Sequence, residues 1–181
     1  WSTKYKTNNF KNSTDTDLIN LLENKITNSV GLQMNADVST GSFLSGGIDS
    51  SLISSIMSKI SEKKINTFTI GFENQEYDES KYAKNIANFL GSKHHYHLFK
   101  PQEVISIIDR LDKVYDEPFA DSSQLPTLLL SQFASKHIKV ALSGDGADEL
   151  FGGYNRYKYI NLIHNLSSKI PISVLEDNIL F

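Results

Sequence analysis

The chain has 181 residues, of which 39% are hydrophobic and 22% are charged, a composition typical of a globular domain with its own core. A net charge of -3 disfavours nucleic-acid binding through a basic surface, and the absence of cysteine excludes disulfides, Cys-ligated metals and thiolate chemistry within the chain. No apolar run is long enough to span a membrane and no signal peptide follows Trp1, so we expect a cytoplasmic protein without membrane or nucleic-acid partners.

Strand and helix patterns alternate along the first half of the chain. Helices are indicated by apolar residues at helical spacing, and strands by β-branched and aromatic runs that end at turn residues. Thr14 or Asp15 can cap the first helix, and Gly91 stands where a C-terminal glycine cap belongs. The expected elements are an arm over 1–14, a helix over 15–34, a strand over 37–44, a turn over 45–50, a helix from about 50 to 60, a strand over 66–72 and a helix over 79–90.

The second half continues the same alternation. Its expected elements are a strand over 93–98, a helix over 101–115, a loop over 116–121, a helix to about 136, a strand over 138–142, a turn over 143–153 and a tail that is helical to about 169. Strands separated by helices indicate parallel βαβ units, whose right-handed connections give a doubly wound α/β sheet with helices on both faces. In such sheets, ligands bind beyond the carboxyl ends of the strands, at the point where the strand order reverses.

Two glycine-rich turns follow apolar strands. The first, Ser45-Gly46-Gly47-Ile48-Asp49-Ser50, joins a strand to a helix. Glycines without a Cβ let backbone N–H groups approach a phosphate, and the helix N-terminus adds a favourable dipole. Asp49 fits such a site when Mg²⁺ lies between the carboxylate and the phosphates. The alternative is a tight turn with a serine cap and no ligand; no lysine follows the glycines as it does in a Walker motif.

The second turn, over 143–154, contains Asp145, Asp148 and Glu149 together with four glycines. Three acids this close repel one another unless a cation neutralises them. The spacing is not that of an EF-hand, which favours a magnesium–nucleotide role over a calcium loop or a solvated acidic loop. We expect the strands before the two turns to be neighbours and the turns to form one site.

At these turns the chain resembles the synthetase domain of the glutamine-dependent asparagine synthetase family. Residues 45–50 are similar to the pyrophosphate loop of the ATP-pyrophosphatase superfamily, which several ligases share, whereas residues 143–154 are far more specific to the asparagine synthetase branch. Residues 69–72 and 115–118 also resemble that branch. The resemblance extends from about residue 15 to residue 157, and it implies a Rossmann-like, adenine nucleotide alpha hydrolase-like fold.

The resemblance implies an ATP-dependent amide-forming ligase that uses ATP and Mg²⁺. In that chemistry the β-carboxylate of aspartate attacks the α-phosphate, pyrophosphate leaves, and ammonia, normally from glutamine, converts the β-aspartyl-adenylate to asparagine and AMP. The resemblance assigns Mg²⁺ to Asp49 and Asp148, catalysis to Asp49 and Asp145, and the acyl substrate to Asp145. The residues it assigns to ATP and pyrophosphate are Leu44, Ser45, Gly46, Gly47, Ile48, Asp49, Ser50, Ile70, Gly71, Ser143 and Gly144.

The chain departs from the family in two places. Several members have glutamate where this chain has Asp145, and a later family segment with phosphate-contacting basic residues is not seen before Phe181. We therefore expect 15–181 to be a synthetase domain truncated at its C-terminal end, following a glutaminase domain in the full-length chain and able to form a homodimer. Without a cysteine, this part alone would have to use free ammonia.

Two alternative functions stay open. One is another adenylating amidotransferase of the same fold, either β-lactam-forming or active on surface polysaccharides. The other is a nucleotide-binding module without catalysis, against which the intact Asp49 and Asp148 argue.

Two further groups of residues give weaker signals. Asp121 and Ser123 precede a helix and are candidates either for substrate contact or for capping. Three histidines follow at 94, 95 and 97, but on a strand the first points to one face and the other two to the opposite face, which makes a poor metal-ligand set.

Overall fold

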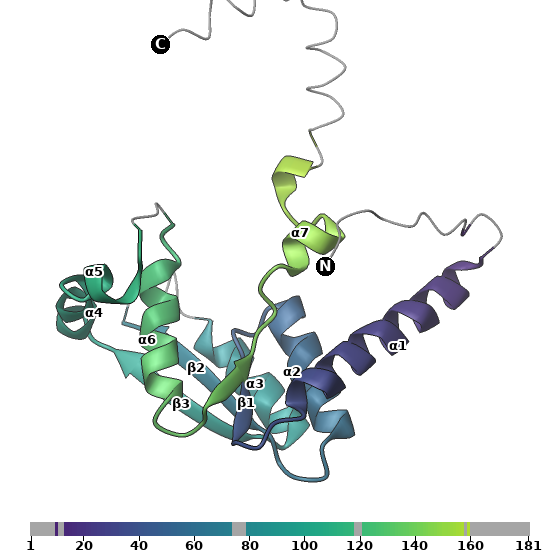
Figure 1. Ribbon diagram of the computed structural model, residues 1–181, viewed down its shortest axis with the longest axis horizontal. Helices are drawn as coiled ribbons and strands as arrows, with labels where there is room; N and C mark the ends of the chain where they lie inside the picture. The colour runs from purple at the N-terminus through teal and green to yellow at the C-terminus, as the bar shows by residue number, and fades with distance from the viewer. Residues whose placement is uncertain (1–9, 11–12, 74–78, 118–120, 158, 160–181) are drawn as a thin grey trace, which may run out of the picture. The chain divides into compact units, whose positions relative to one another are not determined.

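The computed structural model describes residues 10, 13–73, 79–117, 121–157 and 159 (Figure 1). The chain divides into two compact units, residues 1–143 and residues 144–181, and each is described by itself. Among the described residues, no helix combines the length and apolar character that a membrane crossing requires.

The first unit contains a parallel four-stranded sheet with the strand order β3-β2-β1-β4 (Figure 1). Its strands are β1 (Thr40–Phe43), β2 (Asn66–Phe72), β3 (Lys93–Phe99) and β4 (Val140–Leu142). The chain passes from β1 through β2 to β3 in one direction and then returns to add β4 on the other side of β1. The strand order therefore reverses between β1 and β4, which is the switch point of the sheet.

Six helices are described in the first unit and one in the second. Those of the first unit are α1 (Asp15–Met34), α2 (Ile48–Ile60), α3 (Ser80–Leu90), α4 (Pro101–Ile108), α5 (Leu111–Val114) and α6 (Gln124–Ala134), and the helix of the second unit is α7 (Ala147–Phe151).

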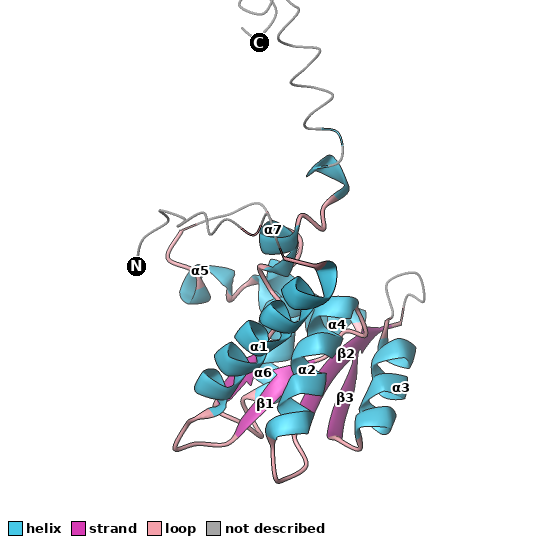
Figure 2. Ribbon diagram, turned by 90° about the vertical axis from the view of Figure 1, so that its right-hand side faces the viewer, coloured by secondary structure: helices cyan, strands magenta, loops and turns pink. Residues whose placement is uncertain are grey.

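Helices cover both faces of the sheet (Figure 2). Along β1, Ser42 points toward α2, where its hydroxyl bonds that of Ser54, and the next residue, Phe43, packs into the cluster beneath α6. The core is accordingly split into two layers by the sheet. The buried residues on the α2 and α3 side are Val30, Leu44, Ile56, Met57, Ile65, Ala83, Ala87 and Leu142. Those on the α4 and α6 side are Phe68, Phe99, Ile107, Leu129, Ala134 and Ile138. The expected doubly wound α/β fold is confirmed.

The ends of two helices follow from local sequence. Thr14 caps α1, with its hydroxyl accepting from the Asp17 N–H at 3.2 Å while the Asp17 carboxylate accepts from the Thr14 N–H at 3.0 Å. Gly91 ends α3 at φ +63°, a backbone conformation that favours glycine. Both caps are as the sequence predicts.

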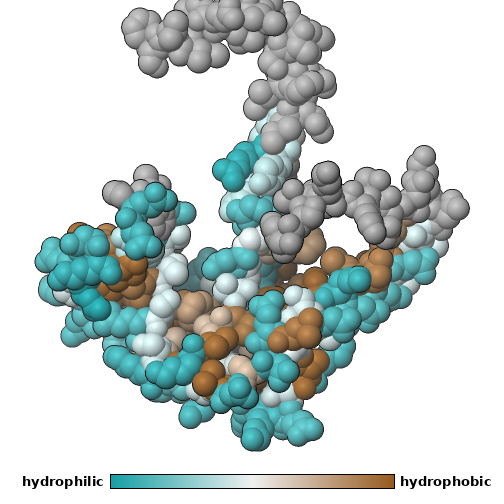
Figure 3. Space-filling model, in the orientation of Figure 1, coloured by the Kyte–Doolittle hydropathy of each residue, from teal (hydrophilic) through white to brown (hydrophobic). Residues whose placement is uncertain are grey.

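Only the second half of α1 is packed. Val30 is buried and Ile26 and Met34 lie against the same cluster, but Ile19 and Leu22, one to two turns into the helix, are exposed. Apolar surface along α1 is visible in Figure 3. The regular apolar spacing of residues 18–30 therefore predicts the helix correctly but overstates how much of it is buried in the described structure.

Three elements begin later or earlier than the sequence predicts. The strand expected over 37–44 begins at Thr40, and the strand expected over 138–142 begins at Val140, because pairing of β1 with β4 covers only those residues. The second helix begins at Ile48 rather than near Ser50, since Gly47 already has the extended backbone of an N-cap.

Two expected helices are shorter or divided. The helix expected over 101–115 is split into α4 and α5, because the Arg110 N–H bonds the Ile107 carbonyl three residues back and tightens the turn there. The helix before 136 starts at Gln124, because the carboxylate of Asp121 takes the Ser123 N–H and forms a separate turn. Most of the arm over 1–14 and most of the expected helical tail lie outside the described residues.

Candidate functional site

The carboxyl edge of the sheet collects the predicted nucleotide-binding segments of the first unit. In β1, Phe43 pairs with Phe68 of β2, and Ser42 pairs with Leu142 of β4. Leu44 and Ser143 therefore leave adjacent parallel strands at the same edge, where β2 also ends. The expectation that the strands before the two turns are neighbours is confirmed.

The loop over 45–50 is held by its own hydroxyl groups. The Ser45 hydroxyl accepts from the Gly47 N–H at 3.1 Å, and the Ser50 hydroxyl accepts from the Ser45 N–H at 3.2 Å. The two hydroxyl oxygens are 3.0 Å apart, and that of Ser50 also donates to the Gly47 carbonyl at 3.2 Å. The serine hydroxyls thus hold the loop in shape.

The two glycines of the loop have different surroundings. Gly46 has φ +93°, and a Cβ there would lie 2.7 Å from the Cβ of Tyr82 and 2.8 Å from the backbone N of Ala83, both in the first turn of α3. Gly47 has an ordinary φ of -69°, and a Cβ on it would meet only the Ser45 hydroxyl at 3.3 Å. Gly46 is therefore needed by the packing of α3, whereas the open side of Gly47 is where an anion can approach the backbone.

The N-terminus of α2 is open to a ligand. Its N-cap is Gly47, so no side chain caps the first N–H groups of this 13-residue helix. Ile48 at the first position is 87% exposed, which places the start of the helix at the surface. Asp49 stands in that first turn and is half-buried. Uncapped N–H groups and the helix dipole together form a site suited to an anion.

The chain that enters the loop is fixed by β2. Leu44 is 1% exposed, its N–H donates to the Phe68 carbonyl at 2.9 Å, and its carbonyl accepts from the Thr69 hydroxyl. The side chain of Ile70 packs against the cluster of Phe99, and Ile70 is paired with His97 of β3. Thr69 belongs to the run 69–72 that resembles the family, but the sequence did not predict a role for its hydroxyl.

The second glycine-rich turn belongs to the second unit. Gly146 has φ +87° and forms the N-cap of α7, a short helix that the sequence did not predict. Asp148 and Glu149 lie in its first turn, where the helix dipole favours negative charge. A Cβ on Gly153 would lie 1.9 Å from Oδ1 of Asp148, so this carboxylate occupies the space that the glycine leaves free.

Glu149 is engaged with the chain that follows α7. Its carboxylate accepts a hydrogen bond from the Tyr154 hydroxyl at 2.8 Å, and this bond raises the pKa of Tyr154 above its ordinary value. The guanidinium of Arg156 lies 4.3 Å from the centre of the Tyr154 ring. Glu149 is thus tied within its own unit, and Asp145 and Asp148 remain the acids of the turn that we consider as ligands.

Asp121, Ser123 and the three histidines at 94, 95 and 97 make contacts within the fold. The carboxylate of Asp121 accepts from the Ser123 N–H at 2.8 Å, which lowers the pKa of Asp121 and makes both residues part of the turn before α6. His94 bonds Thr67 on one face, while His95 and His97 point to the other, as expected. In the described ranges no group of three His, Asp or Glu side chains is placed to hold a metal ion.

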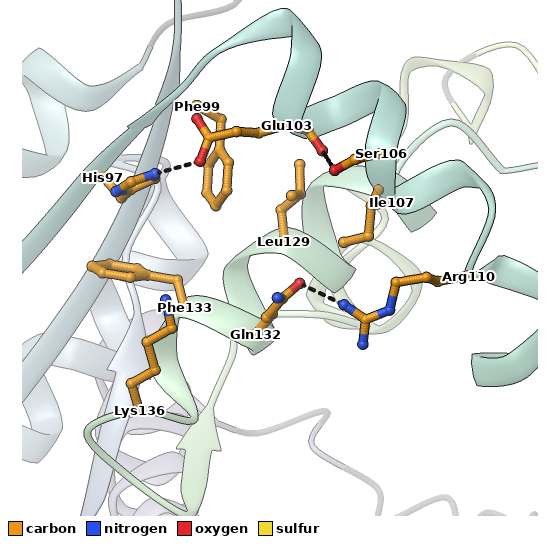
Figure 4. A pocket seen from close by; sticks show the side chains of 10 residues that line it. All are labelled: His97, Phe99, Glu103, Ser106, Ile107, Arg110, Leu129, Gln132, Phe133 and Lys136. Carbon is orange, nitrogen blue, oxygen red and sulfur yellow. Dashed lines mark hydrogen bonds and ion pairs between the residues drawn. The ribbon is translucent and has the colours of Figure 1, made fainter.

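A pocket between β3, α4 and α6 contains none of the predicted site residues (Figure 4). Its floor includes Phe99 and Leu129, and its rim carries the ion pair between His97 and Glu103 at 3.3 Å. Its volume of about 190 Å³ is below the roughly 300–1,000 Å³ of sites that hold cofactors. The loop over 45–50 is therefore the better candidate for a nucleotide.

Comparison with known proteins identifies the family of the chain. The family described as Asparagine synthase matches residues 21–180. The asparagine synthetase [glutamine-hydrolyzing] 1 of Bacillus subtilis is 40% identical over 159 residues, which are 87% of this chain and 25% of that protein. A curated protein of Methanocaldococcus jannaschii is 40% identical over 155 residues, 80% of this chain and 30% of its own length. The chain thus spans between a quarter and a third of these relatives.

One solved structure supports the fold. The NH3-dependent NAD synthetase from Campylobacter jejuni superposes with a TM-score of 0.51 over 75% of this chain and 60% of its own. At 17% identity the likeness concerns the fold alone.

Proposed function

This chain belongs to the asparagine synthase family, and from that premise we propose that it forms the synthetase part of an ATP-dependent amide-forming ligase. The acyl substrate is the side-chain carboxylate of aspartate, which attacks the α-phosphate of ATP and releases pyrophosphate. Ammonia then attacks the acyl carbon of the β-aspartyl-adenylate, and asparagine and AMP leave.

The observation that carries the proposal is the loop over 45–50 at the switch point of the sheet. The uncapped N–H groups of the α2 N-terminus lie there beside Gly47, in a loop that two serine hydroxyls hold in shape. These donors suit the pyrophosphate part of ATP, because its negative charge increases as the α-phosphate bond breaks. The backbones of Leu44, Ile70, Gly71 and Ser143, at the same edge, are assigned to the adenosine.

The residues of the chain also fit a magnesium ion. Asp49 in the first turn of α2 and Asp148 in the first turn of α7 offer the carboxylate oxygens that Mg²⁺ prefers. The space kept free by Gly153 is filled by the Asp148 carboxylate, so a larger residue there would displace this donor. When bound, Mg²⁺ would neutralise phosphate charge; Asp49 and Asp148 would hold it.

We also propose roles for residues of the second turn. We assign Asp145 to the acyl substrate, and Gly144 to the nucleotide, in accord with the family resemblance. Catalysis is then electrostatic and positional: the carboxylate nucleophile needs no general base, and the protein holds it in line with the α-phosphate. We further propose that the full-length polypeptide supplies ammonia from glutamine at a separate glutaminase domain, and that it acts in the cytoplasm, as a homodimer.

The test is isotope exchange between labelled pyrophosphate and ATP, catalysed by the full-length protein. We expect exchange that requires both aspartate and Mg²⁺, since adenylation is reversible before ammonia is added. Asp49→Asn should lower the exchange rate at least about 100-fold, which corresponds to roughly 3 kcal/mol of lost transition-state stabilisation. Asp109→Asn, on the exposed end of α4, is the matched control and should leave the rate unchanged.

The outcomes separate the candidate functions. Exchange with another carboxylic acid, but not with aspartate, would replace the acyl substrate and favour a different adenylating amidotransferase. Binding of ATP without exchange on any acid would contradict catalysis and leave a nucleotide-binding module.

A further inference from the structure

We infer that Ser42 and Ser54 are positioning residues for the phosphate loop, joined in a buried hydroxyl chain that fixes the first turn of α2 on the sheet. This inference rests on the proposed nucleotide site, and neither serine is among the residues that the family resemblance assigns to it. Both side chains are 0% exposed, so they act without touching the ligand.

The chain of hydrogen bonds runs from the sheet to the loop. The Ser54 hydroxyl donates to the Ser50 carbonyl at 2.8 Å, and the Ser42 and Ser54 hydroxyl oxygens are 2.9 Å apart. Because the one proton of the Ser54 hydroxyl goes to Ser50, Ser42 is the donor in the second bond. Ser42 belongs to β1, whose pairing with both β2 and β4 makes it a central strand.

A serine that bonds the carbonyl four residues back is common in helices and alone would mean little. Here the same hydroxyl also takes a bond from a residue 12 positions earlier, in the interior of the protein. Two hydroxyls buried in an apolar layer lose their hydrogen bonds to water, and this arrangement replaces those bonds with hydrogen bonds inside the protein. The pair therefore selects one position of α2 along β1.

The residue at the end of this chain is the one that closes the loop. Ser50 bonds the Ser45 N–H and the Gly47 carbonyl through its hydroxyl, while its carbonyl is held by Ser54. A shift of the first helical turn would move the Ser50 hydroxyl, the Asp49 carboxylate and the uncapped N–H groups together. Anion sites of this kind lose affinity when their donors move by a fraction of an ångström.

The experiment compares four variants of the full-length protein: Ser54→Ala, Ser42→Ala, the double variant, and Ser58→Ala. Ser58 is the matched control, because it lies one turn further along α2 and its hydroxyl bonds the Leu90 carbonyl at 3.3 Å, away from the loop. Three quantities are measured: the melting temperature, the KM for ATP together with kcat in pyrophosphate exchange, and amide hydrogen exchange of residues 45–50 without ligand.

We expect Ser54→Ala and Ser42→Ala each to raise the KM for ATP by about three- to tenfold with kcat changed by less than about twofold, and to speed amide exchange in the loop. Ser54→Ala leaves the buried Ser42 hydroxyl without its acceptor and lowers the melting temperature. In Ser42→Ala the Ser54 hydroxyl keeps its bond to the Ser50 carbonyl, so the melting temperature falls less. The double variant removes both hydroxyls, so its melting temperature rises above that of Ser54→Ala, but its KM and loop exchange stay as high as in either single variant. Ser58→Ala leaves KM and loop exchange unchanged.

The positioning role is overturned if the KM and loop exchange of the double variant recover along with its melting temperature, or if Ser58→Ala affects them as strongly. These outcomes are distinct from failure of the proposed function. A wild-type protein without pyrophosphate exchange contradicts the ligase, whereas the amide exchange of the loop still decides whether Ser42 and Ser54 hold it.

Discussion

Gly46 and Gly47 are adjacent in the loop but are required for different reasons. At Gly46 the left-handed φ of +93° and the first turn of α3 both exclude a side chain. At Gly47 the backbone conformation suits any residue, and a Cβ would meet only the Ser45 hydroxyl. Gly46 is therefore explained by a folding constraint, whereas for Gly47 we propose a role in binding.

This difference predicts two distinct results of alanine substitution. Gly46→Ala should reduce the free energy of unfolding by at least about 2 kcal/mol, since the left-handed backbone alone costs about 1–2 kcal/mol and the Cβ would clash with Tyr82 and Ala83. Gly47→Ala should change stability by less than about 1 kcal/mol but should raise the KM for ATP. Urea unfolding and pyrophosphate exchange measure the two effects. Equal loss of stability in both variants would contradict the assignment.

At the scale of elements, β3 and α6 bring histidines together on one face of the sheet. The ring of His95 stacks on Phe68 at 4.7 Å and lies 4.3 Å from the ring of His137, just beyond the end of α6. Burial, followed by the nearby His137, Lys93 and His94, lowers the pKa of His95 below its ordinary 6.5. Burial and Lys84 lower the pKa of His94 in the same direction.

The direction of these pKa shifts determines whether the stability of the folded protein rises or falls with pH. Because the folded protein binds the proton on His95 less readily than the unfolded chain, this contribution to stability is complete above the ordinary pKa of 6.5. It is lost as the pH falls from there toward the lower folded pKa. The melting temperature should therefore fall as the pH is lowered from 7.5 to 5.5. This pH range lies above 4.5, the ordinary pKa of Glu103.

The matched variant for this effect is His95→Gln. It keeps a polar side chain beside Asn66 and leaves His97 with its partner Glu103. We expect a smaller fall in the melting temperature of this variant over the same pH range. An undiminished fall would assign the acid sensitivity to other groups.

At the scale of the whole molecule, the residues that we propose for the ligand come from both glycine-rich turns. Asp49 and the loop over 45–50 belong to the first unit, and Asp145 and Asp148 belong to the second. The proposal that the two turns serve one ligand rests on the family resemblance.

The proposal that Asp49 and Asp148 hold one magnesium ion predicts coupling between the two carboxylates. Asp49→Asn and Asp148→Asn should each raise the Mg²⁺ concentration that gives half-maximal pyrophosphate exchange. The double variant should be impaired by clearly less than the product of the two single effects, because either change already weakens the same ion. Both melting temperatures should stay near that of the wild type, since Asp49 and Asp148 are not in the core. Multiplicative effects would indicate that the two carboxylates act at separate sites.

The sequence by itself determined most helices and strands of the first unit, the parallel doubly wound sheet, and the fact that the strands before the two turns are neighbours. These follow from signals that act over a few residues, such as apolar spacing, the Thr14 cap and Gly91, together with the general handedness of βαβ units. The chemistry of the two glycine-rich turns indicated a phosphate and magnesium site, whereas the adenosine contacts and the role of Asp145 were assigned by the family resemblance. All of these residues remain a proposal.

Only the tertiary structure decided how the phosphate loop is held. The bond from Thr69 to Leu44, the pair of Ser42 and Ser54, and the contact of Gly46 with α3 join residues that lie 12 to 37 positions apart. Such partners depend on strand register and on where a helix lies on the sheet, and no local spacing encodes either. The same reason applies to α1. Its apolar spacing predicted the helix but not that the first half would be exposed, because burial also depends on which surface packs against the helix.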